Sequence, residues 1–146
     1  MVVVDFLTTL RRGVPFPPVR WGRGGKAALT GSGSFLSNGY GLVLDAETDL
    51  IIDSVAMYPS GSGNITVTVQ SCVSCTTPTI LGTYTYTFTN ATGQGQMVPM
   101  GVFLPQGQGY FMKISSFGSN IYALGRDFPF SGYPLHNSSA LTVAKG

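Results

Sequence analysis

Hydrophobic and polar residues alternate along much of the chain after residue 39. In ITVTVQ, residues 65–70, an aliphatic side chain occupies every second position. In TYTYTFT, residues 83–89, aromatic residues alternate with threonine in the same way. A period of two is typical of a β-strand that buries one face and exposes the other. Both segments are therefore predicted to be strands at the surface of a core.

Shorter segments of the same kind follow one another, separated by residues that favour turns. SGSGN, residues 60–64, is expected to be a hairpin turn, because Gly and Asn tolerate positive φ. Pro59 is expected to end the strand before it, and Pro99 should make its own strand an edge or a bulged one. The other predicted strands are YGLVLDA (40–46), DLIIDSVAMYP (49–59), TILGTYTYTFTN (79–90), MVPMGVFLP (97–105), YFMKISS (110–116), IYALGRDF (121–128) and ALTVAK (140–145).

Eight or nine strands without a convincing helix predict an all-β protein. The expected architecture is an antiparallel two-sheet sandwich, jelly-roll or Ig-like, in which the apolar faces of the strands form the core. The expected core residues are Leu42, Leu44, Ile52, Val55, Ile65, Val67, Val69, Tyr84, Tyr86, Phe88, Val102, Leu104, Phe111, Ile114 and Leu141.

The first residues differ from this pattern. We expect residues 1–38 to form a basic arm and linker rich in Pro and Gly, and residues 39–146 to form the sandwich. Residues 1–26 carry a net charge of +4 and the remaining residues a net charge of −2. The residues expected to dock the arm on neighbouring subunits are Phe6, Leu7, Leu10, Arg11, Arg12, Phe16, Arg20, Trp21 and Arg23.

Composition favours assembly over catalysis. Charged residues make up 10% of the chain, and surfaces so poor in charge tend to be covered by neighbouring subunits. The single histidine, His136, and six acidic residues offer little for nucleophilic or glycosidic catalysis, so no enzyme activity is expected. No cofactor is expected, and nucleic acid is not expected as a partner, because the few basic residues of the arm are interrupted by Pro and Gly.

Three smaller features leave alternatives open. Cys72 and Cys75 form a CxxC without the further ligands of a zinc site, so a turn between strands is favoured over a redox pair. Acidic residues at 45, 47, 49 and 53 suit either a solvated turn or calcium, and no metal site is assigned. Aromatic residues late in the chain would suit glycan stacking or would plug one end of the sandwich. They are Tyr122, Phe128, Phe130 and Tyr133.

From about residue 39 onwards, the order of features resembles a β-sandwich module that recurs in large secreted and surface proteins of Bacteroidota. The matching elements are residues 51–70, 83–89, 97–115 and 126–134, the last with an arginine that leads into FPFSGYP. These are turn and core patterns, so the resemblance implies a fold more than a function. Modules of that family are usually parts of long exported chains, whereas this chain is short and begins with its own basic arm.

The expected function is therefore structural. A free-standing module with an arm looks like a virion protein of a phage of such bacteria, such as a capsid, penton, fibre or decoration protein, whose partners are copies of itself and other subunits. The alternative is a glycan-binding or adhesion module at the cell surface or outside the cell. No secretory signal and no membrane span is expected from the sequence.

Overall fold

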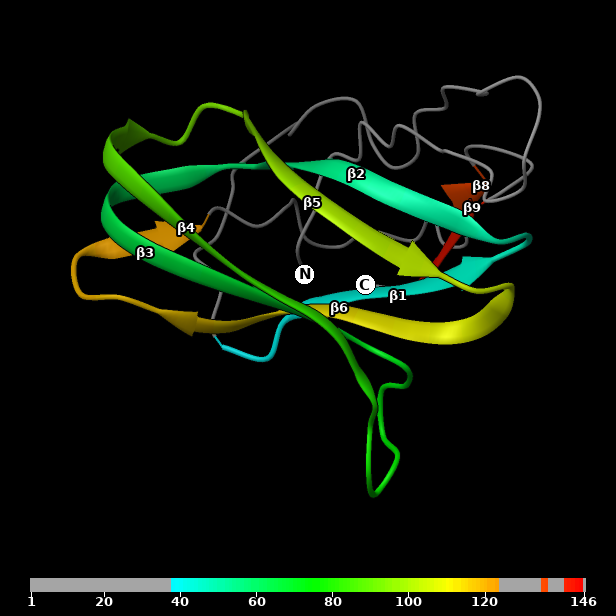
Figure 1. Ribbon diagram of the computed structural model, residues 1–146. Coiled ribbons are helices and arrows are strands. Elements are labelled where there is room, and N and C mark those ends of the chain that lie inside the picture. The colour runs from blue at the N-terminus through cyan, green and yellow to red at the C-terminus, as the bar shows by residue number, and fades with distance from the viewer. Residues whose placement is uncertain (1–37, 124–134, 137–140, 146) are drawn as a thin grey trace.

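The computed structural model describes residues 38–123, 135–136 and 141–145. These residues contain nine strands and no helix (Figure 1). The strands are β1 (Gly41–Ala46), β2 (Leu50–Met57), β3 (Pro59–Gln70), β4 (Ile80–Thr92), β5 (Gln96–Leu104), β6 (Gly107–Phe117), β7 (Ile121–Ala123), β8 (Leu135–His136) and β9 (Leu141–Lys145).

The strands form two antiparallel sheets of unequal size. The larger has seven strands in the order β4-β3-β6-β1-β9-β8, with β7 paired to the first residues of β3. The smaller consists of β2 and β5. Figure 1 shows the smaller sheet above the larger one, with the β3–β4 hairpin extending beyond both. The prediction of an all-β protein with two antiparallel sheets is confirmed.

The core lies between the two sheets, and most of the predicted core residues are in it. Residues that alternate along β1, β3 and β6 from the large sheet meet alternate residues of β2 and β5 from the small one. The side chains that are less than 2% exposed include Leu44, Leu50, Ile52, Ile65, Val69 and Leu104. None of the described residues belongs to a helix long and apolar enough to cross a membrane.

Three predicted core residues are not buried in the core, and one of them lies on the opposite face. Phe111 is on the outer face of β6, because Tyr110, Met112 and Ile114 occupy the alternate positions that point inward. Lys113 lies over the Phe111 ring, with its Nζ 5.9 Å from the ring centre. Successive side chains of a strand point to opposite faces, so Phe111 and Ile114, which are three positions apart, cannot both point into the core.

The other two, Tyr84 and Tyr86, point inward but are only half-buried. They lie on β4, at the edge of the seven-stranded sheet, where a two-stranded sheet gives incomplete cover. The prediction therefore had the right face of β4 but overstated its burial.

The predicted hairpin turn at residues 60–64 is wrong, because these residues belong to β3. Gly61 and Gly63 have φ of +103° and +150°, and the pairing with β4 shifts between them. The turn after β6 crosses close to this part of β3. Its Asn120 carbonyl oxygen accepts a hydrogen bond from the Ser62 N–H at 3.0 Å. The glycines therefore permit a close approach between segments rather than a reversal of the chain.

The prediction for Pro99 is confirmed in both senses. Strand β5 pairs only with β2 among the described residues, and its register shifts between Ile52 and Ser54 of that partner. Two residues of β5, Met100 and Gly101, stand opposite Asp53 at this bulge, and Gly101 has φ of +70°. Proline has no N–H to donate to a further strand, which suits an edge.

Candidate functional site

Most of the predicted site residues lie outside the described residues. This applies to every arm residue proposed for docking, from Phe6 to Arg23, and to Phe128, Phe130 and Tyr133 of the aromatic group. Tyr122 of that group is described. It lies on β7 and is 51% exposed.

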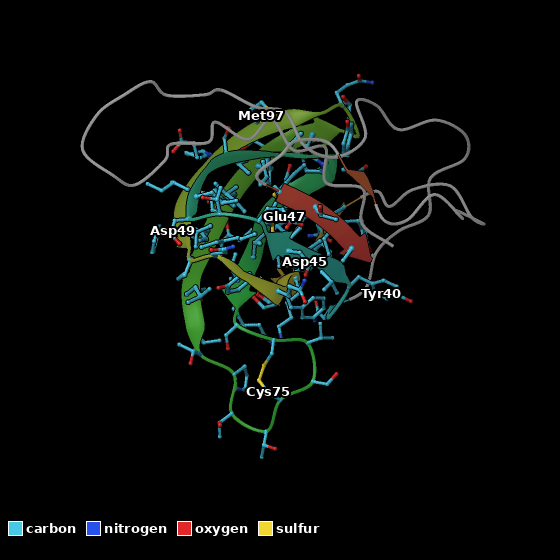
Figure 2. All side chains as sticks on the ribbon, turned by 90° about the vertical axis from the view of Figure 1, so that its right-hand side faces the viewer. Tyr40, Asp45, Glu47, Asp49, Cys75 and Met97 are labelled. Atoms are coloured by element: carbon cyan, nitrogen blue, oxygen red, sulfur yellow. A yellow bond between two sulfur atoms is a disulfide. The ribbon has the colours of Figure 1, made fainter. Side chains whose placement is uncertain are left out.

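The acidic residues tie one end of the fold together. The Asp45 carboxylate accepts a hydrogen bond from the Gly109 N–H at 2.8 Å, and Asp49 accepts one from the Gln106 N–H at 2.7 Å. Glu47 accepts one from the Thr142 hydroxyl at 3.2 Å. Figure 2 shows these three acids near one another at the end of the sandwich where β1 turns into β2.

These contacts favour a structural role for the acidic turn over calcium binding. Each carboxylate binds a different segment, namely the β5–β6 turn, the start of β6 or β9. Within the part of the chain that the structure describes, no three His, Cys, Asp or Glu side chains are grouped to hold a metal ion. Among the described residues, these three acids place negative charge at this end of the sandwich.

The outer face of the β2–β5 sheet is an exposed apolar surface. Met97 is 46% exposed and Phe103 is 47% exposed, and Pro99 between them is exposed as well. Ile51 pairs with Phe103 across the sheet and is half-buried. We call this surface, with Asp53 beside its middle, the β2–β5 outer face.

The sequence pattern alone does not identify this surface. The strand MVPMGVFLP was recognised, but its inward and outward residues are all apolar or glycine, so alternation does not distinguish its two faces. A strand that is apolar on both faces is itself a signal for burial on both faces. Here Met97, Pro99 and Phe103 on the outer face of β5 remain exposed.

The outer face of the large sheet is polar and rich in threonine. Thr66 and Thr85 share a hydrogen bond of 3.0 Å between β3 and β4, and the Thr87 hydroxyl donates to the Asn64 side chain at 2.8 Å. Thr68 donates to Ser115 at 3.0 Å, which extends the network to β6. These bonds between neighbouring strands stabilise the sheet by satisfying its outer hydroxyls.

The two tyrosines of β4, Tyr84 and Tyr86, have raised pKa values. Burial raises the pKa of Tyr86 to about 12, with a further increase from the neighbouring Tyr84. Burial also raises the pKa of Tyr84. The Tyr86 hydroxyl donates a hydrogen bond to the Pro99 carbonyl, which joins the edge of the large sheet to β5 of the small one.

This shift predicts a loss of stability at high pH. The unfolded chain deprotonates Tyr86 near pH 10, whereas the folded chain holds the proton to about pH 12. Stability from this group is therefore complete below pH 10 and falls as the pH rises from 10 to 12. We expect Tyr86→Phe to reduce this decline, measured as the urea midpoint at several pH values. An unchanged decline in the variant would show that other groups cause it.

The cysteines form a disulfide in the loop between β3 and β4. Cys72 and Cys75 are joined, and the Ser71 N–H donates to the Thr79 carbonyl to close the loop. Figure 2 places Cys75 in the loop that projects furthest from the sheets. The prediction of a turn between strands is confirmed. Thiol chemistry would require reduction of this bond first.

One cavity between the sheets is too small for a substrate. It is lined by Val55, Met57, Val67 and Met112, among others, and its volume is ≈ 10 Å³. That is about the room needed for a single water molecule. Its lining is mostly apolar and also includes Tyr40 and Lys113.

Comparison of the chain with protein-family models, with curated proteins and with solved structures finds no match. A function must therefore be argued from the surfaces described above, together with the composition of the arm.

Proposed function

We propose that this chain is a non-enzymatic structural subunit of a multi-subunit assembly, namely a phage virion protein of the capsid, penton, fibre or decoration type. In this proposal a jelly-roll or Ig-like sandwich packs beside its neighbours, and residues 1–38 dock on an adjacent subunit. The observation that carries the proposal is the β2–β5 outer face, which is exposed and apolar along β5 and has one acidic residue, Asp53, on the neighbouring strand β2.

The arm and this surface are complementary in two respects. The arm combines aromatic and aliphatic residues with Arg11, Arg12, Arg20 and Arg23. The β2–β5 outer face combines Met97, Pro99 and Phe103 with the nearby carboxylate of Asp53. Each apolar side chain covered on docking stabilises the complex by about 1–2 kcal/mol at most. Arginine pairs with carboxylates through directed hydrogen bonds, which would fix the orientation of the arm.

Removal of the arm tests this function. We expect a chain lacking residues 2–26 to remain folded but to lose assembly, because the connecting segment is gone. A finer version replaces Arg11, Arg12, Arg20 and Arg23 together with glutamine, and the matched control replaces them with lysine. The glutamine variant should assemble poorly and the lysine variant better, because lysine keeps the charge. The measurement is native mass and negative-stain imaging of each chain.

Assembly of the truncated chain at the yield of the full chain would contradict the proposal. Equal assembly of the glutamine and lysine variants would show that the positive charge of the arm does not contribute to docking. Docking through the apolar residues of the arm would not be contradicted. A closed ring, a filament or a shell in the images would show which kind of virion component the subunit forms.

The alternative is a glycan-binding module at a cell surface or outside the cell. Its support is Tyr122, whose exposed ring has the flat apolar face on which sugars stack. Specific retention of the folded chain on a glycan array, lost in Tyr122→Ala, would favour this alternative over the virion function.

A further inference from the structure

The described residues contain three substantial strand edges without a second partner. They belong to β4 in the large sheet and to β2 and β5 in the small one. An open edge presents unpaired N–H and C=O groups and so can accept a strand from another chain. Natural sheets guard such edges with charged residues, proline, bulges or short strands.

Two of the three edges carry such guards near the middle of the strand, whereas the register shifts of β4 lie outside Gly82–Phe88. Strand β2 contains Asp53, and β5 contains both Pro99 and the bulge at Gly101. Strand β4 reads ILGTYTYTFTNAT, with 13 residues and neither a charged residue nor a proline. Its threonines and aromatic residues also have high β-propensity. Of these edges, β4 is the one best suited to pairing with another strand.

The regular part of β4 is self-complementary. Its pairing with β3 is regular from Gly82 to Phe88, with shifts in register on either side. A two-fold axis through Thr85, at the middle of this run, would place Thr83 opposite Thr87 of a second copy and Tyr84 opposite Tyr86. Because the axis stands perpendicular to the sheet, both copies keep their threonines outside and their tyrosines inside.

We propose that β4 is a dimerisation edge, at which β4 of a second copy of this chain adds in antiparallel register about Thr85. The half-buried rings of Tyr84 and Tyr86 support this occupant, because they lie where the β2–β5 sheet leaves the edge of the large sheet incompletely covered. In the dimer, the rings of the two copies face each other across the axis and bury their exposed sides. The absence of charge on β4 leaves no repulsion between the copies.

This inference goes beyond the proposed function, because it requires neither the arm nor the β2–β5 outer face. Arm docking joins subunits through residues 1–38, whereas β4 pairing joins them through the opposite sheet. Arm-deleted chains should therefore still form β4 dimers, although they lose the larger assembly that depends on arm docking. Loss of the β4 dimer in variants with an intact arm would therefore be independent of arm docking.

The test uses the full chain and two double substitutions that differ only in the sign of the charge placed at residue 87. T83K/T87K places lysine opposite lysine at both pairs across the axis, and T83K/T87E places lysine opposite glutamate. Both variants lose the Thr87 hydroxyl that donates to Asn64, so this loss is matched. We expect T83K/T87K to raise the dimer dissociation constant at least about tenfold and T83K/T87E to restore most of the affinity, by sedimentation equilibrium. Circular dichroism of both variants checks that they are folded.

Crosslinking tests the register independently. Residues directly opposite in an antiparallel pair have Cα atoms about 4.5–5.5 Å apart, within the range of a disulfide. We expect Thr85→Cys to form a disulfide-linked dimer under mild oxidation. Ser116→Cys is also exposed but lies on β6, an inner strand of the sheet with β3 and β1 as neighbours, and it should not.

Three outcomes would overturn the proposal. A full chain that is monomeric at high concentration has no such dimer. Equal dissociation constants for T83K/T87K and T83K/T87E would show that these residues do not face each other. Loss of association in T83K/T87K without a Thr85→Cys crosslink would mean that another segment, such as the arm, occupies the β4 edge.

Discussion

Gly61→Ala should lower the free energy of unfolding by about 3–5 kcal/mol, whereas Gly101→Ala should lower it by only about 1 kcal/mol. Both glycines have positive φ, +103° and +70°, and both lie at irregularities of a strand. They differ in their surroundings. A Cβ on Gly61 would lie 2.2 Å from the Asn120 carbonyl oxygen, whereas a Cβ on Gly101 would meet nothing within 4 Å.

The difference between the two variants isolates the close approach of β3 and the turn after β6. Strain from positive φ is common to both, and a left-handed conformation costs an L-residue about 1–2 kcal/mol. The remaining loss in Gly61→Ala comes from pushing Asn120 away, which also disturbs its hydrogen bond with the Ser62 N–H. Urea denaturation at neutral pH measures both values. Equal losses would show that the turn moves aside easily and does not constrain β3.

This region also shows what the sequence could not predict. The residues SGSGN have the composition of a hairpin turn, and local turn preferences correctly identify glycine that needs positive φ. Turn preferences do not reveal why these glycines need positive φ. The cause is a segment almost 60 residues further along the chain, which approaches β3 only in the folded protein. Local propensity and tertiary context therefore agree on the residue type but differ on the structure.

Where a strand alternates strictly, the sequence was a reliable guide to which face points inward. ITVTVQ in β3 places its aliphatic residues in the core, as predicted. In β6, by contrast, Tyr110 and Phe111 are adjacent aromatics, and only the burial of Met112 and Ile114 settles which one points inward. The unequal size of the two sheets was also not predictable, because strand number in each layer depends on pairing between distant segments.

The candidate surfaces were predictable to a lesser degree. The acidic cluster was identified from spacing alone, but its contacts with the β5–β6 turn depend on how distant segments meet. The β2–β5 outer face and the β4 edge became evident only from topology, because the same apolar or threonine-rich sequences would be unremarkable in central strands. A surface for partners is defined by which strands lie at an edge and which faces lack a covering layer.

Two adjacent residues of β5, Phe103 and Leu104, allow stability to be separated from assembly. Leu104 is 0% exposed and pairs with the equally buried Leu50, whereas Phe103 is 47% exposed on the outer face. We expect Leu104→Ala to lower the free energy of unfolding by about 2–5 kcal/mol, because it leaves a cavity in the core. Phe103→Ala should lower it by less than about 1 kcal/mol.

Assembly should respond in the opposite order if the β2–β5 outer face receives the arm. Phe103→Ala removes the largest exposed apolar side chain of that face, so it should weaken assembly of the full chain while the fold remains stable. Leu104→Ala should leave assembly intact at temperatures where the variant stays folded, because its side chain points into the core. Native mass of both variants, with urea midpoints measured alongside, provides the comparison. Normal assembly of Phe103→Ala would place the docking site of the arm on another surface.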